Sequence, residues 1–173
     1  LANTLTMRYD TFICILTLPL DVTKTSFNHY PPSLSDYALH DEHIDLWFFS
    51  LKNQKISTFF LDEEEKQRAE RFHFAHHQRR FSVAHTITRV ILARYLKTTP
   101  EEFFYIKNRQ GKPNVYPNPH GLEFNLTHSG EWAMLAVGKN NAIGIDVEQF
   151  SPRSYLGLAK HAFSLQETNS LLA

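Results

Sequence analysis

The sequence predicts an α+β fold, and three observations support this prediction. A stripe of apolar and small residues from Arg80 to Leu96 is typical of a long helix packed on a core. The segment 124–129 alternates between mostly apolar side chains and polar ones, as strands with one buried face do. Lys139-Asn140-Asn141 separates two further strand-like segments, which favours an antiparallel hairpin.

The first 43 residues differ from the rest of the chain. Phe12 to Leu20 is an apolar run that is too short to span a bilayer and has no small-residue cleavage site after it. We interpret it as an extra N-terminal strand or an upstream reading-frame extension. The prolines within 29–35 predict an extended linker, so compact structure is expected to begin near Ile44.

Two helices are expected after an opening strand at Ile44–Trp47. Asp62 to Phe72 is rich in Glu, Lys, Gln and Arg and begins with acidic residues, which predicts a charged surface helix. Arg80 to Leu96 is the longer and more buried helix. Its basic residues are expected on the face away from the core: Arg79, Arg80, Arg89 and Arg94. Of these, only the residues near the start of the helix are able to converge on a ligand.

Two strands carry the chemistry. In 124–129, Asn125, Thr127 and Ser129 share one face, and a twist before Gly130 would bring Thr127 and His128 to one anion, since both side chains donate hydrogen bonds. The expected hairpin joins 132–137 to 142–147. In its second strand Ile143, Ile145 and Val147 point one way, and Gly144, Asp146 and Glu148 the other. Two carboxylates roughly 6 to 7 Å apart favour a shared cation, although an isolated pair of this kind is more typical of a solvated edge strand.

Composition limits the classes of function. With 42% hydrophobic residues the chain is able to bury a core, as one compact domain or one domain and part of a second. Eighteen basic and eighteen acidic residues cancel, so no general attraction to nucleic acid or a membrane surface is expected. The single cysteine, Cys14, excludes an internal disulfide and fits the reducing cytoplasm. His73 and His77 are spaced by one helical turn, but without a third ligand they favour a solvated His-rich connection over a zinc site.

The order of these motifs resembles that of the 4'-phosphopantetheinyl transferases of the large, single-chain, surfactin-synthetase-activating type. The resemblance runs from Ile44 to the last residue and rests on Ile44-Asp45-Leu46-Trp47, Glu70-Arg71-Phe72, Arg79-Arg80-Phe81, Gly111-Lys112-Pro113, Phe124-Asn125-Leu126-Thr127-His128-Ser129, Gly144-Ile145-Asp146-Val147-Glu148, and Ala162-Phe163-Ser164 with Glu167. It implies two similar α/β halves around a pseudo-twofold axis. Residues 44–138 would form the first half, 139–173 the start of an incomplete second half, and 1–43 an extension and linker.

The resemblance also implies a site. Asp146 and Glu148 are expected to ligate Mg²⁺, and Arg80 to hold the adenosine 3'-phosphate of coenzyme A. Lys112, Thr127 and His128 are expected to contact the other coenzyme A phosphates. Arg68 is a weaker candidate, because the neighbouring 63–65 is acidic where relatives often carry lysine.

One departure from the family concerns the catalytic glutamate. Relatives continue into a Trp-x-x-Lys-Glu-Ala helix whose glutamate completes the metal site or acts as the base, whereas this sequence stops at Ala173. The catalytic residue is therefore expected beyond Ala173, and Glu167 is not assigned in its place. We interpret the chain as a fragment or a truncated product.

The implied activity is the Mg²⁺-dependent transfer of 4'-phosphopantetheine from coenzyme A to a serine of an acyl or peptidyl carrier protein. It would release adenosine 3',5'-bisphosphate and serve fatty acid, nonribosomal peptide or polyketide biosynthesis, in a cytoplasmic monomer. Two alternatives stay open. One is a truncated, non-catalytic module that binds coenzyme A or a carrier protein; the other is a metal-dependent phosphodiester hydrolase, which needs more acidic ligands than the sequence offers.

Overall fold

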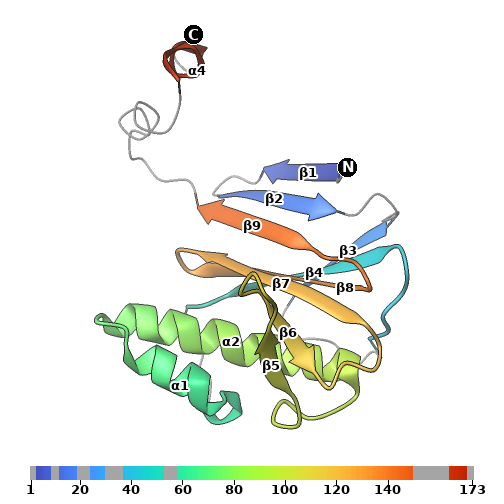
Figure 1. The fold of residues 1–173 in the computed structure, drawn as a ribbon. Helices are drawn as coiled ribbons and strands as arrows, with labels where there is room; N and C mark the ends of the chain where they lie inside the picture. The colour runs from blue at the N-terminus through green and yellow to red at the C-terminus, as the bar shows by residue number, and fades with distance from the viewer. Residues whose placement is uncertain are drawn as a thin grey trace.

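The chain combines helices with mostly antiparallel strands, which confirms the predicted α+β class (Figure 1). The structure is a computed structural model and describes residues 3–8, 12–18, 24–29, 37–52, 58–149 and 164–170. The strands are β1 Asn3–Arg8, β2 Phe12–Leu18, β3 Lys24–His29, β4 His43–Ser50, β5 Phe104–Lys107, β6 Pro113–Tyr116, β7 Leu122–Ser129, β8 Trp132–Lys139 and β9 Gly144–Gln149. The helices are a 3₁₀ turn at Thr58–Phe60, α1 Glu63–Glu70, α2 Ala75–Leu96 and α4 Leu165–Ser170.

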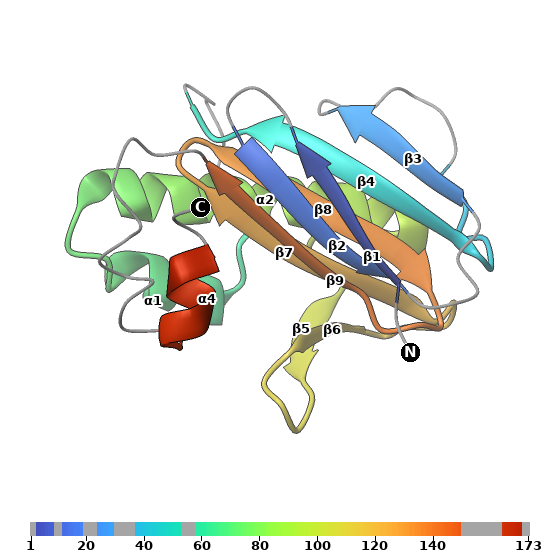
Figure 2. The ribbon, with the colours of Figure 1, turned by 90° about the horizontal axis from the view of Figure 1, so that it is seen from above.

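Three layers build the body of the molecule. The middle layer is a sheet with the strand order β3-β4-β8-β7. Helices α1 and α2 lie on one side of it, and a smaller sheet, β1-β2-β9, covers the other side (Figures 1 and 2). The hairpin of β5 and β6 is a two-stranded sheet of its own, and its Val115 is buried in the same apolar cluster as Leu92 and Phe124.

Each face of the middle sheet has its own apolar core. Trp47, Leu92 and Phe124 belong to the core between α2 and the sheet. Leu46 and Ile145 belong to the core between the sheet and β9. Strand β8 is buried from Ala133 to Gly138 because it lies between the two cores, and for this reason it shows no polar alternation.

Both predicted helices are confirmed, with two differences. Asp62 caps α1 by accepting from the Glu65 amide at 2.8 Å while the Glu65 carboxylate accepts from the Asp62 amide at 3.0 Å, so the helix starts where the sequence predicts. Helix α2 begins at Ala75, five residues earlier than expected. The prediction that Arg89 lies on the outer face is wrong: its side chain is 1% exposed because it pairs with Glu65, the buried carboxylate of α1.

The predicted hairpin of 132–137 with 142–147 is wrong. Strand β8 pairs with β4 and β7, whereas β9 pairs with β2 in the other sheet. The chain changes layers after Asn140, which has a positive φ of 59°. The change of layer buries Ile143, Ile145 and Val147 against the face of the middle sheet, a packing that a hairpin with β8 would not provide.

Structure also begins earlier than predicted. The parallel pairing of β3 with β4 and the antiparallel pairing of β2 with β9 place segments before Ile44 in both sheets. Apart from His29, which ends β3, the predicted linker 29–35 lies outside the described residues, as do Ala162 and Phe163 of the family motif. The proposed boundaries 1–43, 44–138 and 139–173 stay predictions. No helix within the described ranges is both long and apolar enough to cross a membrane.

Candidate active site

Strand β9 presents two carboxylates on one exposed face. Ile145 and Val147 are buried, whereas Asp146 and Glu148 are exposed. This alternation is the predicted one, and it follows from the two-residue repeat of a strand. Gly144 shares the carboxylate face, so no side chain stands beside Asp146 at that position.

Side chains, and not a backbone ladder, join β7 to β9. Alternate β9 amides donate to β7 side chains: Ile145 to Asn125 at 2.8 Å, Val147 to Thr127 at 3.2 Å and Gln149 to Ser129 at 3.0 Å. We call these three bonds the β7–β9 seam. Because side chains and amides both repeat every two residues along a strand, one face of β7 meets every second amide of β9. The seam therefore sets the register of the strand that carries the acids.

Thr127 links the seam to the acids. Its hydroxyl accepts from the Val147 amide and donates to Oδ1 of Asp146 at 3.0 Å. Within the described residues Oδ2 of Asp146 has no hydrogen-bond donor. A hydroxyl that holds a carboxylate in this way orients it for a cation.

His128 lies on the other side of β7 from Thr127, because neighbouring side chains of a strand point to opposite faces. Partial burial, and then the positive charges of His85 and Arg80, lower the pKa of the His128 imidazole below its ordinary value. His128 thus belongs with the cations at the start of α2. The convergence of Thr127 and His128 on one anion stays a prediction.

Arg80 lies at the end of the middle sheet where β7 turns into β8. Its Nε and Nη2 donate to Oε1 of Glu131 at 2.9 and 2.7 Å. Arg68, the weaker candidate, sits with its guanidinium 5.2 Å from the centre of the Phe81 ring. Both residues contribute, after partial burial, to the lowered pKa of His128, so their positive charges act on this imidazole in the described structure.

Lys112 lies at the opposite end of the seam. It follows Gly111, which has a φ of 83° in the turn between β5 and β6. Its Nζ donates to the Ile143 carbonyl at 3.1 Å and lies 3.5 Å from Glu123. Lys112 therefore sits where β9 begins, and a phosphate arriving there would compete with the Glu123 carboxylate.

The donor atoms fit Mg²⁺, which prefers oxygen ligands and is often held by one or two carboxylates together with substrate phosphates. Asp146 and Glu148 supply that number. No group of three or more His, Cys, Asp or Glu side chains suited to a metal ion occurs within the ranges that the structure describes. The ranges searched include His77, which lies in the first turn of α2, and His73, which lies just before that helix.

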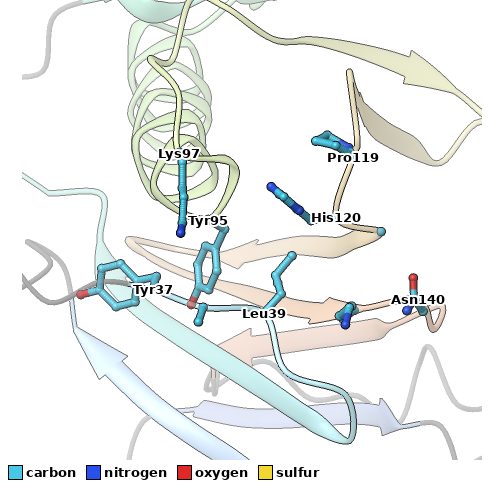
Figure 3. A pocket seen from close by; sticks show the side chains of 10 residues that line it. Tyr37, Leu39, Tyr95, Lys97, Pro119, His120 and Asn140 are labelled. Atoms are coloured by element: carbon cyan, nitrogen blue, oxygen red, sulfur yellow. The ribbon is translucent and has the colours of Figure 1, made fainter.

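One pocket in the described structure lies away from these residues. It has a volume of about 530 Å³ and surrounds the end of α2, with Tyr37, Tyr95, Lys97 and His120 among the residues that line it (Figure 3). The predicted acids, Arg80 and His128 do not line it. We therefore base the site on the carboxylate face of β9 and the cations, and not on this pocket.

Sequence reasoning missed two features of the site. It placed Asn125 and Ser129 on the correct face but assigned them no contact, although the seam needs both. It also gave no role to Glu131, which binds Arg79 and Arg80. A carboxylate directly after a Ser-Gly turn between two strands was the available signal, but its partners lie 51 and 52 residues away in the chain.

The fold therefore presents two exposed carboxylates on β9 and places Arg80 at the end of the middle sheet. Residues 46–140 match the family described as "4'-phosphopantetheinyl transferase, N-terminal". The match covers more than half of the chain, and the chain therefore belongs to the 4'-phosphopantetheinyl transferases.

Three curated relatives illustrate this membership. The chain is 37% identical over 144 residues to the 4'-phosphopantetheinyl transferase HetI of Nostoc sp., covering 79% of this chain and 60% of HetI. It is 33% identical over 114 residues to psf-1 of Bacillus pumilus, covering 66% and 48% of the two chains. It is 29% identical over 113 residues to the enzyme of Bacillus subtilis, covering 65% and 49%. The chain thus spans about half to three fifths of the length of these relatives.

Proposed function

We propose that this chain provides the coenzyme A and metal site of an enzyme that transfers 4'-phosphopantetheine to a serine of an acyl or peptidyl carrier protein. The observation that carries the proposal is the exposed pair of Asp146 and Glu148, with Asp146 held by Thr127, in a chain of this family. We further propose that the enzyme acts as a cytoplasmic monomer in fatty acid, nonribosomal peptide or polyketide biosynthesis.

Asp146 and Glu148 would hold Mg²⁺ through their carboxylate oxygens. When bound, the ion would neutralise charge that develops on the pyrophosphate of coenzyme A. Thr127 orients Asp146 and leaves its Oδ2 for this purpose. Lys112 and His128 would bind phosphate oxygens, and Arg80 would bind the 3'-phosphate through charge-assisted hydrogen bonds.

The proposed transfer makes one bond and breaks one bond. The serine oxygen of the carrier protein bonds to the phosphorus next to pantetheine, and the pyrophosphate bond breaks. Adenosine 3',5'-bisphosphate leaves with the bonding electrons, and the serine proton passes to a general base. No described residue is assigned as that base.

A second candidate function is a module that binds coenzyme A or a carrier protein without transferring the group. One observation favours it: beside the proposed ligands Asp146 and Glu148, the described residues form no group of three or more His, Cys, Asp or Glu side chains suited to a metal ion. Such a module would use the same cations and the same carboxylates, but it would leave the carrier serine unmodified.

The test measures binding and transfer separately. The chain is incubated with coenzyme A, Mg²⁺ and an acyl carrier protein; mass spectrometry detects the phosphopantetheine adduct, and calorimetry measures binding of coenzyme A. An adduct supports the transferase, and binding without an adduct supports the module. Absence of both would reject both functions.

One substitution tests the metal ligand. Asp146→Asn keeps the shape and an oxygen that can accept from Thr127 but removes the charge, so we expect Mg²⁺-dependent binding or transfer to fall by more than about 100-fold. Glu101→Gln, in the exposed connection between α2 and β5, is the matched control. Activity retained by Asp146→Asn would exclude Asp146 as a ligand.

A further inference from the structure

Glu131 binds two arginines of α2. It lies in the turn between β7 and β8, three residues after His128. Its carboxylate accepts from Arg79 Nη2 at 2.9 and 3.0 Å, and its Oε1 also accepts from both Nε and Nη2 of Arg80. Two guanidinium groups therefore share one carboxylate, and one net positive charge remains.

The backbone fixes Glu131 in place. Its carbonyl accepts from the Leu51 amide at 2.8 Å, and Arg79 Nη1 donates to the Leu51 carbonyl. Leu51 directly follows β4, so three parts of the fold meet here: the end of β4, the turn before β8 and the second turn of α2. Arg79 serves as an anchor, because both of its terminal nitrogens are bonded.

Arg80 keeps one donor group for a ligand. Its Nε and Nη2 are bonded to Glu131, whereas its Nη1 has no hydrogen-bond acceptor among the described residues. Without Glu131 the two neighbouring guanidinium groups would repel each other, and the long Arg80 side chain would sample many rotamers. The carboxylate removes both obstacles before any ligand arrives.

Glu131 is ionised at neutral pH. Burial by itself would raise its pKa, but the hydrogen bonds from Arg80 and Arg79 outweigh burial and lower the pKa of the Glu131 carboxyl below its ordinary value. The contact is therefore a true ion pair, and a ligand that binds Arg80 meets a cation whose orientation is already set.

We propose that Glu131 is a positioning residue for an anionic ligand: it holds Arg80 so that the free Nη1 faces the 3'-phosphate of coenzyme A. This inference rests on the proposed function, which places that phosphate at Arg80. The competing possibility is that the Glu131 carboxylate occupies the anion site itself and weakens binding of the ligand.

Two ligands that differ by one phosphate test the proposal. Calorimetry with Mg²⁺ compares coenzyme A with dephospho-coenzyme A, which lacks the 3'-phosphate. In Glu131→Gln we expect coenzyme A to bind roughly tenfold more weakly, the effect of one lost charge-assisted hydrogen bond, and dephospho-coenzyme A to bind unchanged. Glu131→Asp, which keeps the charge, is expected to recover part of the difference, and the control Glu101→Gln is expected to bind both ligands as the wild type does.

Three results would overturn the proposal. Tighter binding of coenzyme A by Glu131→Gln would identify the carboxylate as a competitor of phosphate. An equal loss for both ligands, together with a lower melting temperature, would identify a purely structural ion pair. If Glu131→Gln kept the wild-type preference for coenzyme A over dephospho-coenzyme A, the positioning role of Glu131 would be rejected and the proposed function would stand. If the wild-type chain bound neither ligand, the proposed function would be rejected as well.

Discussion

The Thr127 hydroxyl serves two partners at once, and this makes it informative among the individual residues. It accepts from the backbone of β9 and donates to Asp146, so one group fixes both the strand and the carboxylate. Valine has nearly the same shape but cannot make either bond. The two roles are separable because one concerns stability and the other the affinity for a cation.

We expect Thr127→Val to lower the affinity for Mg²⁺ by about 10- to 100-fold, as loss of an orienting hydrogen bond to a ligand does. The unpaired Val147 amide should also lower the free energy of unfolding by about 1 to 3 kcal/mol. Calorimetry measures the first and urea denaturation the second. Thr127→Ser keeps the hydroxyl and serves as the control; a folded Thr127→Val protein with wild-type Mg²⁺ affinity would contradict the role of Thr127.

His128 makes binding of an anion depend on pH. Partial burial and the nearby charges of His85 and Arg80 lower the pKa of the free imidazole, so His128 is mostly neutral at pH 7. A bound phosphate stabilises the imidazolium and raises this pKa. Between the free and the bound pKa, binding therefore takes up a proton, and affinity rises as the pH falls.

We expect the affinity for coenzyme A to increase from pH 8 towards pH 6, by at most about tenfold per pH unit for one proton. The ligand's own phosphates titrate in the same range, so the comparison is with His128→Asn, in which the dependence should be weaker. His120→Asn, in the pocket at the other end of α2, should match the wild type. Identical pH profiles for wild type and His128→Asn would contradict this prediction.

Among the elements, α1 and α2 are held together by a buried ion network. Arg89 Nε donates to Glu65 at 2.6 Å, and its guanidinium also binds Asp62 and the carbonyls of Pro100 and Phe103. The ring centre of Tyr105 lies 4.7 Å from the guanidinium carbon. One side chain of α2 therefore joins the cap of α1 to the segment before β5.

We expect Arg89→Met to lower the free energy of unfolding by about 3 to 5 kcal/mol, because it leaves the buried Glu65 without its arginine partner. Arg94→Met, on the exposed side of the same helix, should change it by no more than about 0.5 kcal/mol. Urea denaturation of the two variants measures both values. A similar, small effect in both would mean that the network contributes specificity and not stability.

Strand β9 is held differently on its two edges. The amides of Ile145, Val147 and Gln149 bond to β7 side chains, so by the alternation of a strand the amide of Asp146 faces β2. Asn125→Ala should therefore speed hydrogen exchange at the Ile145 amide roughly tenfold and leave the Asp146 amide unchanged.

Residue-resolved exchange by NMR tests this difference between the two edges. Asn114→Ala is the matched control, because the Asn114 side-chain oxygen is buried without a hydrogen-bond partner in the described structure and is not part of the seam. Equal acceleration at Ile145 and Asp146 would mean that β9 opens as a unit, contrary to the seam.

For the whole molecule, Glu65 links stability to pH. Burial by itself would raise the pKa of Glu65, but the hydrogen bond and charge of His85 and the charge of Arg89 outweigh burial and lower it. A lowered pKa in the folded state means that the contribution of Glu65 is complete above the unfolded pKa. It is lost as the pH falls through the lower, folded pKa.

We expect the free energy of unfolding to decline below about pH 4.3, with a slope from Glu65 of at most about 1.4 kcal/mol per pH unit. Glu65→Gln should be less stable at pH 7 and show a shallower decline. Urea denaturation between pH 7 and pH 3 provides both curves. Parallel curves for the two proteins would exclude Glu65 as a source of acid sensitivity.

The predictions that rest on local patterns succeeded, and the one that depends on the three-layer arrangement failed. The faces of 124–129 and 143–148 were predicted correctly, as were the start of α1 and the end of α2, because each depends on local periodicity or capping. The hairpin of 132–137 with 142–147 was wrong, because a turn signal at Asn140 does not specify the layer that the next strand enters.

The sequence by itself determined that Asp146 and Glu148 share a face, that 80–96 is helical and that the motifs are those of a 4'-phosphopantetheinyl transferase. Only the tertiary structure decided that β9 lies beside β7, that Thr127 bonds to Asp146 and Val147, and that Glu131 reaches Arg80. The physical reason is range: the two-residue and 3.6-residue repeats assign each side chain to a face. The choice of partner depends on burying two separate apolar cores and on pairing polar and charged groups that lie 19 to 51 residues apart in the chain.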